Sequence, residues 1–167
     1  TKANPTALME AAHRNPNVVL GGSGNMGFIF PQLHPGFDGM FCIAKVIEMM
    51  TIQERSLGQI KAELPRVTHR SYSVRCPWTV KGSLMRYLVE THSPDRLELI
   101  DGVKIFNYDD DNWILVLPDA SEPVVHIFAN SDDRDWVAET LKEYRALVHD
   151  FVTQTEAAVR QTKLVNG

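Results

Sequence analysis

The sequence predicts an α+β protein that divides into two parts at Pro65. From Thr68 onward the order is strand, helix, two or three hairpin-linked strands and a last helix, which is typical of an antiparallel sheet with helices on one face. In the first part, glycines and prolines separate short strand and helix patterns. The hydrophobic fraction of 44% and the charged fraction of 23% are ordinary for a globular protein.

The totals argue against several classes of partner. A net charge of -4 does not suggest a nucleic-acid surface. No apolar run approaches the roughly 20 residues that cross a bilayer, and no signal-peptide pattern is present. Two cysteines, Cys42 and Cys76, do not make a disulfide framework. We therefore expect a cytoplasmic protein without membrane or nucleic-acid partners, and the start at Thr1-Lys2 without methionine indicates an excised fragment.

Three helices and two strands are predicted in the first part. A short helix begins at Pro5, and brief strands follow at Val18–Leu20 and Phe28–Phe30. A stronger helix runs over 38–50, with Asp38 as its cap. Its apolar residues lie on nearly all sides of the helix, so we expect it to be buried on most sides. Cys42 is therefore expected to be an inert buried thiol. A second short helix, Ser56–Leu64, ends at Pro65.

The glycine-rich segment Gly21–Gly27 has the spacing of a dinucleotide-binding loop. That pattern requires a helix after the glycines, whereas Phe28-Ile29-Phe30 is strand-like. The segment also misses the nucleophile elbow by its last residue. A flexible hairpin is the simpler interpretation, because glycine tolerates positive φ.

The second part begins with a basic strand, Thr68–Cys76. Its charges either guard a solvated sheet edge or steer a phosphate, and both interpretations stay open. A helix with Val80, Leu84 and Leu88 on one side follows, and then two strands joined at Asp101-Gly102. The acidic run Asp109–Asn112 lacks the order of a calcium loop and indicates a solvated turn.

A strand–loop–strand unit organises the second part. Trp113–Leu117 and Val124–Ala129 are strand-like, and two prolines bound the polar loop between them. Such a loop can present backbone N–H groups and the Ser121 hydroxyl to a phosphate without a metal. The last helix is expected to start at a Ser131 cap and to keep its periodicity to Val152.

No catalytic set can be assigned from the residues alone. The six histidines lack the close spacing of a metal-ligand pair. His126 lies between apolar neighbours of a strand, where a structural role is expected. No Ser/His/Asp set can be assembled from the sequence order.

The loop resembles the phosphate-binding loop in the C-terminal domain of the α-D-phosphohexomutases, the phosphomannomutase and phosphoglucomutase superfamily. The usual motif is Arg-Pro-Ser-Gly-Thr-Glu-Pro, and here it reads Leu117-Pro118-Asp119-Ala120-Ser121-Glu122-Pro123. Gly22–Gly27, followed by Phe28-Ile29-Phe30 and Phe37-Asp38-Gly39, is similar to that superfamily's sugar-recognition loop. Ser23 replaces the usual glutamate of that loop, and Asn25 replaces its serine.

The resemblance implies an arrangement of domains and a set of contacts. Residues 1–64 would end an α/β third domain, residues 66–152 would form the C-terminal domain, and 153–167 would be a tail without regular structure. Substrate contacts would come from these residues: Ser23, Asn25, Asp119, Ala120 and Ser121.

The reaction implied by the resemblance moves a phosphoryl group between two positions of one sugar phosphate. The superfamily uses an active-site serine loop and an aspartate-rich magnesium loop, and neither motif occurs in this sequence. We therefore expect the chain to be inactive alone and to hold no cofactor, although magnesium is implied for the full-length protein. Its expected partners are mannose or glucose phosphate and the upstream domains of the same protein.

The departures of the loop from the motif weaken phosphate binding. An arginine would supply charge-assisted hydrogen bonds worth roughly 1.5–3 kcal/mol each, and Leu117 supplies none. The Asp119 carboxylate at ~4 Å from a phosphate charge would cost up to about 4 kcal/mol at an effective dielectric near 20. Asp119 is therefore expected to point away, or the loop to hold a phosphate poorly, with the amides near Ala120 and Ser121 still available.

A second resemblance is to the mutase-like region fused behind nucleotidyltransferases of the mannose-1-phosphate guanylyltransferase type. The changed loop, Gly-Phe-Ile-Phe-Pro, Phe-Asp-Gly-Met and Cys-Pro-Trp-Thr-Val-Lys-Gly all fit that subgroup. Two hypotheses follow: a phosphohexomutase fragment that contacts a sugar phosphate, or a catalytically inactive regulatory or interaction domain.

Overall fold

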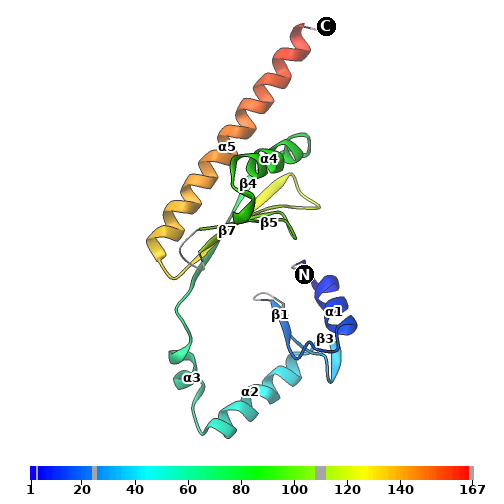
Figure 1. The fold of residues 1–167 in the computed structure, drawn as a ribbon, viewed down its shortest axis with the longest axis vertical. Coiled ribbons are helices and arrows are strands. Elements are labelled where there is room, and N and C mark those ends of the chain that lie inside the picture. Colours follow the sequence, from blue (N-terminus) through cyan, green and yellow to red (C-terminus); the bar gives the residue numbers. More distant parts are fainter. Residues whose placement is uncertain (3, 24–25, 108–111, 166–167) are drawn as a thin grey trace. The chain divides into compact units, whose positions relative to one another are not determined.

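The computed structural model describes residues 1–2, 4–23, 26–107 and 112–165, and Figure 1 shows its elements. The chain divides into two compact units, Thr1–Pro65 and Arg66–Gly167. This division coincides with the boundary that the sequence predicts at Pro65. No helix in the described part of the chain is both long enough and apolar enough to span a membrane.

The first unit begins with α1 (Pro5–Arg14) and a three-stranded antiparallel sheet. The Ala7 amide donates to the Asn4 carboxamide oxygen at 2.9 Å and so caps α1. The strands of the sheet are β1 (Gly21–Ser23), β2 (Gly27–Phe30) and β3 (His34–Phe37), in the order β1-β2-β3.

The prediction of this small sheet is wrong for one strand and lacks another. The strand expected at Val18–Leu20 lies later, because Gly21–Ser23 pairs with Gly27–Ile29. A side chain at Gly22 would come within 2.7 Å of the Phe28 ring, so the glycine lets the two strands approach. Strand β3 was not expected, since its proline and glycine weaken a strand signal.

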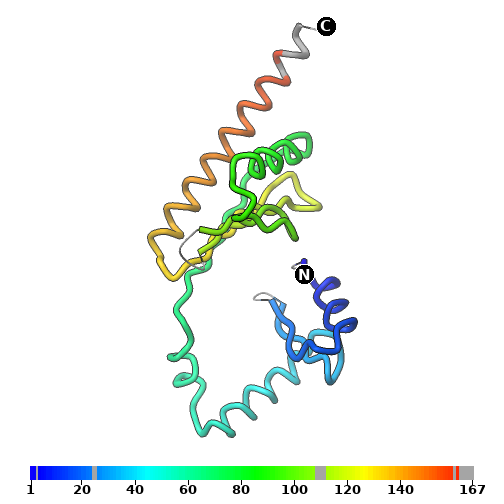
Figure 2. Tube along the Cα trace, viewed as in Figure 1, coloured from blue at the N-terminus to red at the C-terminus, as the bar shows by residue number. Residues whose placement is uncertain are grey.

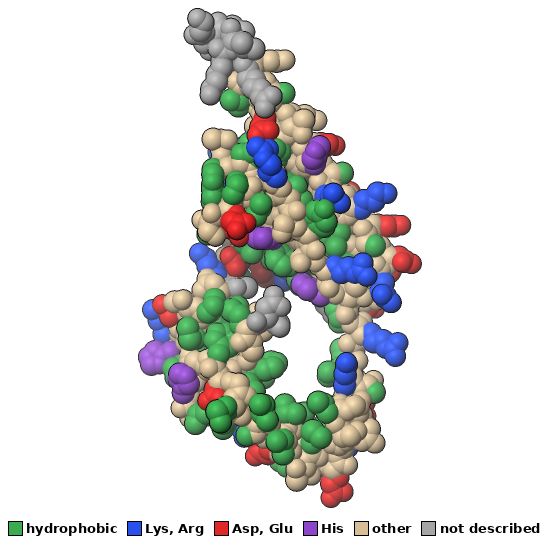
Figure 3. All heavy atoms as spheres, turned by 180° about the vertical axis from the view of Figure 1, so that it is seen from behind, with side chains coloured by type: hydrophobic (Ala, Val, Ile, Leu, Met, Phe, Trp, Pro, Cys, Tyr) green, Lys and Arg blue, Asp and Glu red, His purple; other side chains and the backbone are tan. Residues whose placement is uncertain are grey.

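The helix α2 (Gly39–Gln53) has the predicted cap but not the predicted burial. The Phe41 amide donates to the Asp38 carboxylate at 2.9 Å. No side chain of α2 is buried, Cys42 is only partly so, and Met40 is 85% exposed. Apolar side chains gather on the surface of this unit (Figure 3). A short helix, α3 (Leu57–Glu63), follows with a capping box between Ser56 and Gln59.

The second unit is built on a five-stranded antiparallel sheet in the order β4-β8-β7-β6-β5. Its strands are β4 (Thr68–Arg75), β5 (Leu97–Glu98), β6 (Val103–Phe106), β7 (Trp113–Pro118) and β8 (Val124–Ser131). Strand β5 is shorter than the strand that the sequence predicts over 97–100. The turn before β6 holds Gly102 at φ 81, and a side chain there would meet the Val116 carbonyl oxygen.

Two helices, α4 (Trp78–Thr91) and α5 (Arg134–Val165), cover one face of this sheet (Figure 1). A 3₁₀ turn, η1 (Pro94–Arg96), links α4 to β5. Alternate residues of the strands are buried beneath the helices, as period-2 patterning requires. The following residues form the core: Val74, Cys76, Val80, Leu84, Leu88, Val103, Ile105, Ile114, Val116, Val125, Ile127, Tyr144, Val148 and Val152. The predicted α+β class is confirmed.

The last helix differs from its prediction at both ends. Its first amides, from Asp135 and Trp136, donate to the Asp133 carboxylate, whereas Ser131 is a buried strand residue. The tail expected from Thr153 is helical to Val165 and extends past the sheet (Figure 2). An ion pair of 3.1 Å between Arg75 and Glu156 ties this extension to β4.

In the acidic turn predicted at Asp109–Asn112, only Asn112 is a described residue, and it is buried.

Candidate functional site

The candidate phosphate loop is the connection of the β7–β8 hairpin. Strand β7 ends at Pro118 and β8 begins at Val124, so residues 119–123 make the turn. The Asp119 amide donates to the Val124 carbonyl at 3.1 Å and closes the loop. The Cys76 amide donates to the Pro123 carbonyl at 2.8 Å and fixes the loop to the segment before α4.

The Asp119 carboxylate folds back into its own loop. Its Oδ1 accepts hydrogen bonds from the Ser121 amide at 2.7 Å, the Glu122 amide at 2.7 Å and the Ser121 hydroxyl at 3.0 Å. Its Oδ2 accepts from His126 Nε2 at 2.9 Å. The bonds to residues two and three positions ahead form an Asx-type turn, whereas His126 adds a donor from the following strand.

This geometry changes one expectation about the loop. The Ser121 amide was expected to be available to a ligand, yet it is already bonded to the carboxylate of Asp119. The hydrogen bond from His126 is the largest of several causes that hold the pKa of Asp119 far below its ordinary value, followed by those from Ser121 and Glu122. Asp119 is therefore ionised at neutral pH.

A buried lysine supports the loop from the side of the helices. Lys81 lies in the first turn of α4 and is 7% exposed. Its Nζ donates to the carbonyl oxygen of Asp119 at 2.6 Å and to that of Glu122, and it lies 3.7 Å from the centre of the Trp78 ring. The sequence draws attention to Lys81 only as part of Cys-Pro-Trp-Thr-Val-Lys-Gly. Its role was not predicted, because its partners are backbone carbonyls far along the chain.

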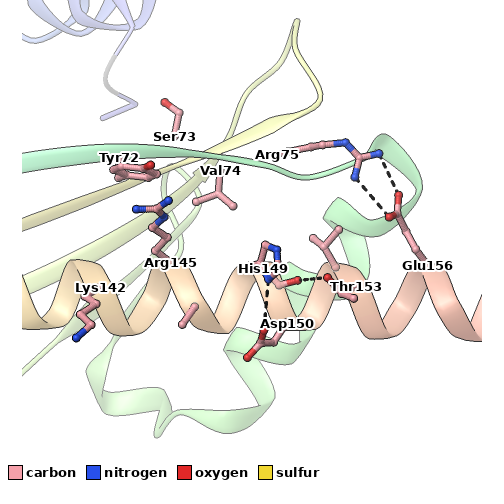
Figure 4. A pocket seen from close by; sticks show the side chains of 12 residues that line it. Tyr72, Ser73, Val74, Arg75, Lys142, Arg145, His149, Asp150, Thr153 and Glu156 are labelled. Carbon is pink, nitrogen blue, oxygen red and sulfur yellow. Dashed lines mark hydrogen bonds and ion pairs between the residues drawn. The ribbon is translucent and has the colours of Figure 1, made fainter.

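His126 supports the loop from the sheet face that the helices do not cover. The carboxylate only accepts, so His126 Nε2 carries the proton, and in the neutral ring Nδ1 accepts from the Ser73 hydroxyl at 2.9 Å. Ser73 points away from α5, on the opposite side of β4 from the buried Val74 (Figure 4). The Ser73–His126–Asp119 series was not predicted, because its members meet only through the pairing of Ser73 with His126 across β4 and β8. It can relay hydrogen-bond polarisation from the loop to an exposed hydroxyl.

Strands β1 and β2, which flank the glycine-rich loop, line a hollow in the first unit. Ser23 lines a space of about 370 Å³ together with Gly21, Gly22, Gly27 and Phe28. The other residue expected there, Asn25, lies outside the described residues. The arrangement of the hollow leaves room for a small polar group beside a glycine backbone.

The structure brings together three of the five predicted contact residues. Asp119, Ala120 and Ser121 share one tight loop in the second unit, and Ser23 belongs to the first unit. That these residues contact a substrate stays a prediction.

A further pocket of about 590 Å³ lies between β4 and α5 (Figure 4). Of its cationic groups, Arg75 is paired with Glu156, and the guanidinium of Arg145 stacks 4.3 Å from the centre of the Tyr72 ring. The pairing of Arg75 fits a solvated sheet edge, and phosphate steering by the rest of the basic strand stays a prediction. Within the described ranges, no group of three or more His, Cys, Asp and Glu side chains could hold a metal ion.

Comparisons with known proteins give the chain relatives but no matching family model. It is 31% identical over 147 residues to a probable phosphoglucosamine mutase of Methanopyrus kandleri. The aligned segment covers 86% of this chain and 32% of that protein. It is 27% identical to a probable phosphoglucosamine mutase of Pyrococcus abyssi, over 94% of this chain and 35% of the other. It is 25% identical to a phosphoglucosamine mutase of Methanococcus maripaludis strain C5. That alignment covers 92% of this chain and 34% of the other protein.

The chain thus spans about a third of the length of these relatives. Its antiparallel sheet with helices on one face fits the C-terminal domain of such a mutase. Over most of its length, this chain is therefore similar to phosphoglucosamine mutases, which are proteins of the phosphohexomutase superfamily.

Proposed function

We propose that this chain contributes sugar-phosphate contacts within a phosphohexomutase-like protein. The observation that carries the proposal is the similarity of most of the chain to phosphoglucosamine mutases. The hollow beside Ser23 supports it as a place for a sugar contact. The Ser121 hydroxyl donates to Asp119, so it can serve a sugar only as a hydrogen-bond acceptor. Mannose and glucose phosphates are the substrates implied by the loop resemblance, and the relatives' name adds glucosamine phosphate as a candidate.

The proposed role is an auxiliary one in phosphoryl transfer. A phosphoserine and a magnesium ion would supply the chemistry from upstream domains of the same cytoplasmic protein. The residues Ser23, Asn25, Asp119, Ala120 and Ser121 would orient the sugar, and none of them would exchange the phosphoryl group. The chain alone would accordingly be inactive.

A second candidate function is favoured by the occupied loop. Leu117 supplies no charge, and the Asp119 carboxylate already takes the amides of Ser121 and Glu122. A mutase-derived region that has lost phosphoryl-group binding suits a regulatory or interaction role. The proposed context is a nucleotidyltransferase of the mannose-1-phosphate guanylyltransferase type.

A titration of the isotope-labelled chain with sugar phosphates tests the first function against the second. Mannose 1-phosphate, glucose 1-phosphate and glucosamine 1-phosphate would be added separately, and the amide shifts of Gly21–Gly27 and Ala120–Glu122 followed. Saturable shifts in either segment, weakened by Ser23→Ala or Ser121→Ala but not by Ser71→Ala on an exposed part of β4, support substrate contact. Flat titrations with all three sugars contradict it and leave the interaction role.

A further inference from the structure

The donors of the β7–β8 loop converge on a single carboxylate. Two backbone N–H groups, from Ser121 and Glu122, and the Ser121 hydroxyl reach Asp119 Oδ1 within 2.7–3.0 Å. A ring N–H from His126 reaches Oδ2 at 2.9 Å. Amides of successive residues beside a hydroxyl are the kind of donor set that holds a bound anion. Here the anion is part of the loop itself.

The carboxylate is held in this position from two neighbouring strands. His126 is aligned by its contact with Ser73 at 2.9 Å, so its Nε2–H is directed at Asp119. Beneath the loop, Lys81 binds the carbonyls of Asp119 and Glu122 and keeps the turn closed. The side chains of His126 and Asp119 are 30% and 23% exposed, so the pair is partly shielded from water.

A second anion cannot use these donors while Asp119 occupies them. A phosphate entering the loop would have to compete with an acceptor that is covalently attached, and it would meet a like charge at close range. Replacing Asp119 by alanine removes both obstacles and leaves the amides, the hydroxyl and the imidazole in place.

We propose that Asp119 is the resident anion of this loop and sets its specificity by excluding phosphoryl groups from the donor set of Ser121, Glu122 and His126. The inference rests on the proposed function, because it concerns the same loop. It assigns the donors of the loop to the Asp119 carboxylate and not to a phosphate. Any sugar-phosphate contact then depends on the hollow beside Ser23 or on groups outside the occupied donor set.

Inorganic phosphate is the probe for the test. The full chain would be titrated by NMR while the amide signals of Ser121 and Glu122 are followed. The wild-type signals are expected to stay in place. The Asp119→Ala variant is expected to show saturable shifts at both amides and at least about a tenfold gain in phosphate affinity, the worth of one charge-assisted hydrogen bond.

Two control variants separate this effect from charge and from misfolding. Asp150→Ala removes one negative charge from the exposed face of α5 and is expected to bring no gain. Asp119→Asn keeps an acceptor for the two amides and so preserves the turn, and it is expected to bind phosphate more tightly than the wild type and more weakly than Asp119→Ala. Retention of dispersed amide signals confirms that each variant is folded.

The inference is overturned if wild-type Ser121 and Glu122 amides shift with phosphate as strongly as those of Asp119→Ala. It is also overturned if neither folded Asp119 variant gains affinity. These outcomes differ from failure of the proposed function, which is tested by sugar phosphates on the wild-type chain. Flat sugar titrations together with phosphate binding by Asp119→Ala would reject the function and retain the inference.

Discussion

The two units bury their apolar side chains to very different extents. In the second unit, Leu84, Leu88 and Ile127 are 0% exposed and belong to a single core. Among the described hydrophobic residues of the first unit, only Ala12 and Ile29 are buried. Met40 and Ile52, both on α2, are 85% and 75% exposed.

This difference shows that hydrophobic pattern and hydrophobic burial are separate properties. The apolar residues of α2 lie nearly all round the helix, a pattern that indicates burial. Burial needs a second surface, and no described element of the first unit covers α2 enough to bury any of its side chains. The second unit provides its own surface, since a sheet with two helices on one face closes a core.

The largest expected effect is in the core of the second unit. Leu84→Ala should lower the free energy of unfolding by about 2–5 kcal/mol, because it removes buried methyl groups and leaves a cavity. Chemical denaturation followed by tryptophan fluorescence measures this, since Trp78, Trp113 and Trp136 all lie in the second unit.

Two matched variants sharpen that comparison. Leu99→Ala, at a position of the second unit that is 57% exposed, and Ile43→Ala, at a 64% exposed position of α2, should each stay within about 0.5 kcal/mol of the wild type. Far-UV circular dichroism adds a signal from the first unit. A loss above about 2 kcal/mol in Ile43→Ala would contradict the contrast between the units.

The next effect concerns the support of the loop. Lys81→Met should cost roughly 2 kcal/mol, because the carbonyls of Asp119 and Glu122 lose a charged hydrogen-bond donor. The equivalent change in the first unit, Lys45→Met, removes an exposed contact with Glu48 and should cost less than about 0.5 kcal/mol. Equal costs in denaturation experiments would show that the loop does not depend on Lys81.

Acid should reveal the contribution of Asp119 to stability. The pKa of Asp119 is lowered in the folded state, so the carboxylate stabilises the fold above its unfolded pKa of about 3.9 and this contribution is lost as the pH falls toward the folded pKa. The difference in unfolding midpoint between wild type and Asp119→Asn should thus shrink as the pH falls below about 4. A difference that grows in acid would have the wrong sign for this account.

The smallest expected effect belongs to the surface ion pairs. Arg75→Gln should cost only about 0.2–1 kcal/mol, because the Arg75 side chain, which reaches Glu156 on α5 (Figure 4), is 68% exposed. Arg14→Gln in the first unit breaks an exposed pair with Glu10 and should cost about as little. Hydrogen exchange beyond Val152 in Arg75→Gln measures how far this pair holds the end of the helix.

The sequence predicted the elements of the fold better than their surroundings. Period-2 and helical patterns identified most strands and helices of the second unit, because its burial follows local periodicity. They did not reveal that α2 lacks cover, since that depends on what packs against it. The end of α5 was missed because helix formers such as Ala157 and Ala158 sustain a helix without an apolar stripe.

The site shows the same limit at the level of single side chains. The loop at residues 118–123 and its hydroxyl were predicted from two prolines and a strand on either side. The alternatives for Asp119 were that it points away or that the loop holds a phosphate poorly, and the structure adds that it binds the loop's own amides. The contributions of Ser73, His126 and Lys81 depend on strand register and on a helix start far along the chain, which no local pattern encodes.

The most direct test of the occupied loop is the pH titration of the Asp119 side-chain carbon signal in the full chain by NMR. The account predicts that this carboxyl is still ionised at a pH of about 3.9, where a free aspartate is half protonated. A midpoint at the ordinary aspartate value would show that the donors of Ser121, Glu122 and His126 do not hold the carboxylate, and would contradict the account.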